Sequence, residues 1–196
     1  MNPIDLAAFA GLTAVVLLTT NLLLGVLVST NYNPAKQWPR RKLPVPLFKI
    51  HNWTAYVAIA VVLLHPTLVL FIKTPNFGIG DVLLPLASPG QRIQNCLGAL
   101  AFYSFLLVVT TSYFRPKLGY RPWKKLHYTA YFAAVCMFMH GILIDQNLKG
   151  EIPDLLDGEK VLVEGCCLLV IAAGLWRWRR GTEKQRYRLA KKQKAA

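Results

Sequence analysis

Residues 50–72 read IHNWTAYVAIAVVLLHPTLVLFI, a run that contains no Asp, Glu, Lys or Arg. An α-helix needs about 20 such residues to cross the hydrocarbon core of a bilayer, which is about 30 Å thick. The run therefore predicts a transmembrane helix. It also carries His51 and His65, two of the four histidines in the chain. Ionisable side chains inside membrane segments are costly and commonly mark a functional site.

Four more segments are long and apolar enough to span a bilayer. Hydrophobic residues make up 54% of the 196 residues and charged residues only 16%. We therefore expect an all-α integral membrane bundle of about five transmembrane helices, with the other four at Leu6–Ser29, Ile93–Tyr113, Leu126–Ile144 and Val161–Trp178. The first segment has no basic residue ahead of it and is too long for a secretory signal, so we expect it to be retained.

Basic residues gather between the first two helices, between the third and fourth, and after the fifth. The positive-inside rule assigns these three regions to the cytoplasm. The rule predicts an outer N-terminus, a cytoplasmic C-terminus and a multi-pass protein of the plasma (cell inner) membrane. We divide the chain into a membrane domain, residues 1–180, and a basic cytoplasmic tail, residues 181–196. The loop that carries Glu151, Asp154, Asp157 and Glu159 is expected outside.

The net charge of +14 is also explained by contact with the membrane. The basic residues border the predicted spans, and no DNA- or RNA-binding motif accompanies them. Anionic lipid headgroups are therefore the expected partner, and nucleic acid is not.

The histidines form two sets with similar spacing. His51 and His65 are 14 residues apart, and His127 and His140 are 13 apart. At 1.5 Å per residue these separations are about 21 and 20 Å, so each set has one histidine near each side of the membrane. The second and fourth helices both run outward, which places His51 with His127 on the inner side and His65 with His140 on the outer side. This layout predicts axial ligation of two stacked haems.

The rotation along the fourth helix fits this prediction less simply. At 100° per residue, a step of 14 returns to within about 40° of the starting face, whereas a step of 13 leaves His127 and His140 about 140° apart. We therefore expect a locally overwound helix, an irregular first turn at His127, or two porphyrins that are differently rotated around the helix.

Residues 111–127, TSYFRPKLGYRPWKKLH, followed by Tyr131 and His140, resemble the ferric reductase-like transmembrane domain. This family includes the membrane halves of ferric reductases and NADPH oxidases. Its other hallmark, an earlier histidine pair, is matched by Lys49-Ile50-His51-Asn52-Trp53 and Leu64-His65-Pro66. The resemblance covers roughly residues 50–147, with the first and fifth helices as flanks.

The resemblance implies two b-type haems that carry electrons from a cytoplasmic donor to an outer acceptor, which could be ferric iron, dioxygen, quinone or a redox protein. Larger relatives append a flavin- and nicotinamide-binding domain. No G-x-G-x-x-G follows a predicted strand in this chain. We therefore expect a haem-carrying oxidoreductase subunit that receives its electrons from a separate cytoplasmic flavin/NAD(P)H reductase. Flavin is expected only in that partner. A redox partner on the outer face is also possible.

Cationic side chains near the membrane faces are candidates to bind haem propionates. Arg121 and Lys124, with Lys125 and with Arg40 or Arg41, are the inner candidates, and Arg92, with Lys73 behind it, is the outer one. The aromatic side chains that could pack on porphyrin, or form an ordinary interfacial belt, are Trp53, Trp123, Tyr128 and Tyr131. No C-x-x-C-H occurs, so covalent c-type haem is excluded.

Bis-histidine ligation leaves no open position on the iron, so transfer to an acceptor would take place at the haem edge. The loops Phe77–Gln91 and Asp145–Lys160 are long enough to lie over the outer haem, and their acids could attract ferric iron.

Three alternatives stay open. The haem subunit of the periplasmic methionine sulfoxide reductase system is similar, although the equivalent of His51 is often missing there. A di-haem cytochrome of the b561 or quinol-linked type would have the same ligands. A non-redox transporter could use the histidines to bind a transition metal or relay protons.

Overall fold

The computed structural model describes residues 2–30, 32, 46–145, 154 and 156–193. No strand occurs among these residues, and the long helices are α1 (Pro3–Thr30), α2 (Leu47–Val69), α4 (Arg92–Tyr113), α7 (Thr129–Leu143) and α8 (Gly158–Gln193). Five stretches of the described residues are helical, long and apolar enough to cross a membrane: Pro3–Thr30, Leu47–Val69, Arg92–Tyr113, Tyr120–Leu143 and Gly158–Thr182. The prediction of an all-α membrane bundle with five transmembrane helices is confirmed.

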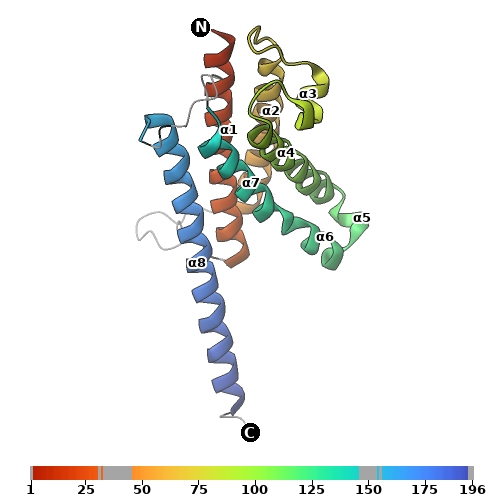
Figure 1. The fold of residues 1–196 in the computed structure, drawn as a ribbon. Coiled ribbons are helices and arrows are strands. Elements are labelled where there is room, and N and C mark those ends of the chain that lie inside the picture. Colours follow the sequence, from red (N-terminus) through yellow and green to blue (C-terminus); the bar gives the residue numbers. More distant parts are fainter. Residues whose placement is uncertain (1, 31, 33–45, 146–153, 155, 194–196) are drawn as a thin grey trace.

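Helix α1 lies between α2 and α8 (Figure 1). Its most extensive contacts are with α2, while α4 makes its own with α7. Small residues sit where the helices cross: Ala58 of α2 is fully buried, and Ala133 of α7 is buried beside Phe105 of α4. Small side chains let helix backbones approach closely, which is the main way that membrane helices gain packing contacts. The two tightly associated helix pairs are therefore α1 with α2 and α4 with α7.

The fourth span is broken, which corrects the single helix expected over Leu126–Ile144. The short helix α6 (Tyr120–His127) ends at His127, and α7 begins at Thr129. A second short helix, α5 (Arg115–Leu118), precedes α6. Gly119 connects them with a φ of 79°, a conformation that favours glycine. The irregular turn at His127, one of the three outcomes predicted from the 13-residue step, is confirmed.

Helix α8 continues past Trp178, where the sequence predicted that the fifth span would end. Its 36 residues correspond to about 54 Å, which exceeds the thickness of a bilayer core. Figure 1 shows this helix extending well beyond the end of the bundle. The region predicted to be a separate basic tail, residues 181–196, is thus a continuation of the helix as far as Gln193.

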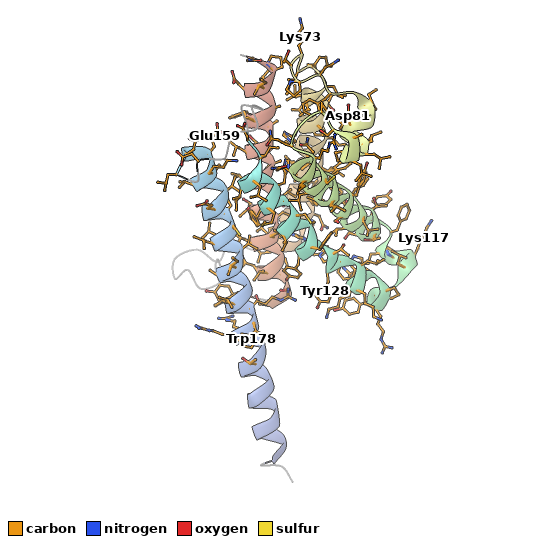
Figure 2. The ribbon with its side chains drawn as sticks, in the orientation of Figure 1. Lys73, Asp81, Lys117, Tyr128, Glu159 and Trp178 are labelled. Carbon is orange, nitrogen blue, oxygen red and sulfur yellow. The ribbon has the colours of Figure 1, made fainter. Side chains whose placement is uncertain are left out.

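The loop between α2 and α4 holds a short helix, α3 (Ile79–Leu83), and a 3₁₀ turn, η2 (Pro85–Ala87). Figure 2 shows Lys73, Asp81 and Glu159 towards one end of the bundle and Lys117, Tyr128 and Trp178 towards the other. We call these the α3 end and the α6 end. The basic segment between α4 and α7 and the basic segment after the fifth span therefore lie towards the same end, the α6 end. The predicted orientation requires this arrangement, and the orientation itself stays a prediction.

Candidate functional site

The four histidines lie as two pairs between α2 and the broken fourth span. The ring centroids of His51 and His127 are 6.3 Å apart, with the ring planes inclined at 74°. The ring centroids of His65 and His140 are also 6.3 Å apart, with an inclination of 72°. The side chains are thus combined as the sequence predicted, and the two pairs have nearly the same geometry.

This spacing suits one metal ion between each pair. With a metal–nitrogen distance of about 2.0–2.1 Å and each nitrogen about 1.1–1.2 Å from its ring centre, two imidazoles on opposite sides of one metal ion have centroids about 6.2–6.6 Å apart. Each observed separation of 6.3 Å lies in that range. Among the described residues, no group of three or more His, Cys, Asp or Glu side chains could hold a metal ion. Each level therefore offers two histidines and, among the described residues, no third His, Cys, Asp or Glu side chain that could share a metal ion with them.

Three of the histidines use Nδ1 to bind a backbone carbonyl. Nδ1 of His51 lies 3.1 Å from Asn21 O, Nδ1 of His65 lies 2.8 Å from Ala7 O, and Nδ1 of His140 lies 2.7 Å from Gln94 O. A carbonyl oxygen only accepts, so in each bond Nδ1–H is the donor. This fixes the tautomer and leaves Nε2 as the nitrogen with a lone pair for a metal.

His127 is held in the same tautomer by a side chain instead of a backbone carbonyl. Its Nδ1 lies 3.3 Å from Ser112 Oγ, and Trp123 Nε1 donates to the same oxygen at 3.2 Å. The Ser112 hydroxyl gives its own hydrogen to Val108 O at 2.7 Å. Because that hydrogen is engaged, the oxygen accepts from both rings, and Nδ1 of His127 is a donor. All four histidines therefore present Nε2.

A glycine lies against each of the three histidines that bind backbone. The ring atoms nearest to a Cβ built on Gly11, Gly25 and Gly98 would be 3.1, 3.3 and 3.0 Å away, in His65, His51 and His140 respectively. Each glycine follows the carbonyl that accepts the bond by four residues, as the pairs Ala7/Gly11, Asn21/Gly25 and Gln94/Gly98 show. Residues four apart lie on one helix face, so the missing side chain opens the path to the carbonyl.

Asn21 also holds the backbone of α2. Its Nδ2 donates to His51 O at 2.6 Å and to Thr54 Oγ at 2.7 Å, while its own carbonyl binds the His51 ring. Asn21 is one of three buried polar residues of α1, with Thr19 and Thr30. Helix α1, which the sequence analysis treated as a flank, is therefore part of the site.

The histidine pairs border a single cavity of about 1060 Å³. This volume is slightly above the range for ligand pockets, about 300–1,000 Å³. Its α6 end is lined by the cations Arg115, Lys124 and Arg177, and its α3 end by Asp81, Asn95 and Asp145. Arg177 also donates to the Tyr131 hydroxyl. The cavity is thus apolar between a cationic α6 end and an α3 end that Asp81 and Asp145 border, where Asp145 interacts electrostatically with Lys160.

The propionate candidates differ in position. Lys124 lines the cavity, whereas Arg121 and Arg92 are not among the lining residues. Arg92 Nε donates to Ser88 O at 3.2 Å, which fixes the loop before α4. The role of all three stays a prediction. Arg40 and Arg41 lie outside the described residues. Sequence reasoning missed Arg115 and Arg177, because only the folded chain shows that α5 and α8 reach the cavity.

The predicted aromatic and loop contacts can be placed as well. Trp123, Tyr128 and Tyr131 line the cavity, while Trp53 is not among its lining residues and is mostly exposed on the lipid side of α2. Phe77, Ile79 and Asp81 line the α3 end, so the loop that begins at Phe77 does border it. Much of the second loop, including Glu151, lies outside the described residues. Its Lys160 is buried and donates from Nζ to Gly141 O at 2.9 Å and to Ile144 O.

The fold and the site define a membrane protein with five transmembrane helices. Across an apolar cavity, His51 and His65 of α2 face His127 of α6 and His140 of α7. The sequence model of the family described as "Ferric reductase like transmembrane component" matches residues 10–138. The chain belongs to this family. The match begins within α1 and ends at residue 138, before His140. The expected limits of the resemblance, residues 50–147, were therefore too narrow at the N-terminal side and too wide at the C-terminal side. Searches of curated proteins and of solved structures returned no match.

Proposed function

We propose that this protein conducts electrons across the plasma membrane through two b-type haems, each ligated by one histidine pair. The inner haem would be held by His51 and His127, and the outer haem by His65 and His140. The observation that carries the proposal is that the two histidine pairs have the same separation, with ring centroids 6.3 Å apart in each. Family membership supports a redox function for the same helices.

The chain's own groups fit such cofactors. All four histidines offer Nε2, because each Nδ1 is a hydrogen-bond donor. The apolar cavity suits a porphyrin, and Arg115, Lys124 and Arg177 at the α6 end suit the carboxylates of its propionates. When bound, bis-histidine haem supplies one-electron chemistry without an open coordination position. The protein then orients the rings, excludes water and leaves donor and acceptor to react at the cavity ends.

The proposed direction runs from the α6 end, which the positive-inside rule places in the cytoplasm, to the α3 end outside. A separate cytoplasmic flavin/NAD(P)H reductase would supply the electrons, and ferric iron, dioxygen, quinone or an outer redox protein would accept them. The carboxylate of Asp81 at the α3 end favours a cationic acceptor such as ferric iron over an anionic one.

A haem subunit of a methionine sulfoxide reductase-like system is the second candidate. The presence of His51 opposite His127 favours two complete haem sites over that candidate. A metal or proton transporter is less well supported, because each level provides only two histidines among the described residues.

The test is a haem count on protein expressed with added haem and purified in detergent. Oxidised and dithionite-reduced spectra and a pyridine haemochrome assay should give two low-spin b-type haems per chain. His51→Met and His65→Met should each leave one bis-histidine haem, at opposite levels. One haem in the wild type would favour the sulfoxide reductase-like subunit. A folded protein without haem would overturn the proposal.

A further inference from the structure

Three rings of α6 form a series of tilted ring contacts that ends at His127, and we call this series the ring stack. Tyr120, Trp123 and His127 are three and four residues apart, which places them on one helix face. The rings of Tyr120 and Trp123 are 5.8 Å apart at 42°, and those of Trp123 and His127 are 5.0 Å apart at 32°. Tyr120 is 57% exposed. The stack therefore connects the molecular surface with one of the paired histidines.

The inner part of this stack is held in place from two sides. Trp123 Nε1 donates to Ser112 Oγ, the oxygen that also accepts from His127. The Arg115 guanidinium lies 4.3 Å from the centre of the Trp123 ring, within the range of a cation–π contact. An indole fixed at both its edge and its face keeps its contact with the His127 ring.

No equivalent stack reaches the other pair. Among the residues that the structure describes, His51, His65 and His140 make ring contacts only with their partner histidines. The connection from surface to site is thus confined to the α6 end. An interfacial belt of aromatic residues would not require this asymmetry, because it would need no contact with a histidine of the site.

The surface around Tyr120 is strongly basic. Residues 113–128 contain Arg115, Lys117, Arg121, Lys124 and Lys125 and no acid. Lys117 and Arg121 are exposed, and Figure 2 shows Lys117 pointing away from the bundle. Lys124 Nζ lies 5.6 Å from the centre of the Tyr120 ring. A positive patch that surrounds an exposed ring favours a partner with a negative surface, because complementary charge speeds encounter and fixes orientation.

We propose that Lys117, Tyr120 and Arg121 form a docking surface for an acidic flavoprotein, and that electrons leave its flavin through Trp123 and His127. This inference rests on the proposed function. In each transfer the reduced flavin of the partner loses one electron, and the iron ligated by His127 is reduced from ferric to ferrous. No bond is made or broken in this chain. Electron transfer slows steeply with distance through non-bonded space, so a packed stack of rings is an effective route.

Anionic lipid headgroups would be attracted by the same cations. A headgroup site, however, has no use for a ring stack that leads to His127. The stack therefore favours a redox partner, and lipid binding becomes one outcome of the test.

The docking surface is tested by stopped-flow reduction of the haem-loaded full chain by reduced flavodoxin, an acidic flavoprotein used as the probe. The Lys117→Glu/Arg121→Glu variant is compared with wild type and with Arg179→Glu. Arg179 is the matched control, because it is an exposed cation on α8 next to Trp178, at the same end of the bundle. We expect the second-order rate constant to fall about tenfold or more in the double variant and to stay unchanged in the control. Equal rates in all three proteins would overturn the docking surface.

The electron route is tested at saturating flavodoxin, where the limiting rate reports transfer within the complex. We expect Trp123→Leu and Tyr120→Leu to lower this limiting rate several-fold, and Trp123→Phe to restore most of it. Reduction of the Lys117→Glu/Arg121→Glu variant by dithionite, a small reductant that needs no docking, should stay as in wild type. Because Trp123 contacts His127, the haem spectrum is recorded for each variant. Tyr120 lines the cavity, but its ring contacts Trp123 and not a histidine ring. Tyr120→Leu therefore decides the result if it keeps its haem and Trp123→Leu does not. A wild-type limiting rate in Tyr120→Leu would overturn the route.

Two further outcomes separate this inference from the proposed function. Wild-type rates in the charge variant, together with haem retention that depends on anionic lipid in nanodiscs, would identify a headgroup site and overturn the inference alone. A wild type without haem would overturn the proposed function, and the haem count is therefore made first on every sample.

Discussion

A Cβ atom on Gly11 would lie 3.1 Å from both Cε1 and Nδ1 of His65. The ring cannot retreat freely, because its Nδ1 donates to Ala7 O at 2.8 Å and its position opposite His140 is set by the pair. Contacts this short are tighter than ordinary van der Waals packing. Helix α1 thus positions the His65 ring in two ways: the Ala7 carbonyl accepts its hydrogen bond, and Gly11 leaves the space that the ring occupies.

Gly11→Ala should therefore weaken haem binding between His65 and His140. Overpacking a fixed site costs about 1–3 kcal/mol, which corresponds to about 5- to 150-fold in affinity. The measurement is haem transfer to apomyoglobin, followed by absorbance. Gly165→Ala is the matched control, because no atom lies within 4 Å of a Cβ at that helical glycine. Equal haem loss from both variants would show that the close contact has no role in binding.

Much of the fold could be predicted from the sequence, because the signals are local. Apolar runs of sufficient length indicated all five spans, and the spacing of the histidines indicated their pairing. The step of 13 between His127 and His140 predicted one of three outcomes, and the structure shows one of them, an irregular turn between α6 and α7.

The support provided by α1 could not be predicted in the same way. A glycine in an apolar helix is common, and nothing local distinguishes Gly11 or Gly25 from a packing residue. The available signal was a coincidence of spacing, since Gly11 and Gly25 are 14 residues apart, as are His51 and His65. It has meaning only once α1 and α2 are known to pair. The position of Arg115 against Trp123 likewise depends on the turn at Gly119.

Asn21→Leu should destabilise the level of His51 and His127. The change keeps the size of the side chain but removes the donor to His51 O and Thr54 Oγ, at a cost of about 1–2 kcal/mol in a membrane interior. We expect a lower thermal midpoint and an altered low-spin EPR signal from one haem. Thr20→Ala is the control, because its hydroxyl binds only Val16 O in its own helix. An EPR change of equal size at both levels would contradict a local role for Asn21.

Lys160→Met should loosen the end of α7 that carries His140. Lys160 is only 3% exposed, and its Nζ donates to the carbonyls of Gly141 and Ile144, which α7 leaves without helical partners. Loss of the donor leaves buried acceptors unsatisfied, at a cost of about 1–3 kcal/mol. Methionine keeps most of the apolar stem, so a drop in the thermal midpoint reports the lost hydrogen bonds together with the lost attraction to Asp145, Glu159 and Asp157. Lys73→Met, at an exposed lysine of the same end, should leave the midpoint unchanged.

Ser112→Ala should affect His127 more than the other three histidines. The Ser112 oxygen accepts from His127 Nδ1–H and from Trp123 Nε1–H, so alanine leaves two ring donors without this partner. Without its acceptor, the imidazole loses the bond that fixes its tautomer and orientation, and second-shell changes of this kind cost about 10- to 100-fold in metal affinity. Ser112→Thr keeps the hydroxyl and should restore binding. Haem counts and reduction potentials at each level measure the effect. A loss from the His65–His140 level instead, with the His51–His127 level intact, would contradict the hydrogen-bond assignment and with it the argument that all four histidines present Nε2.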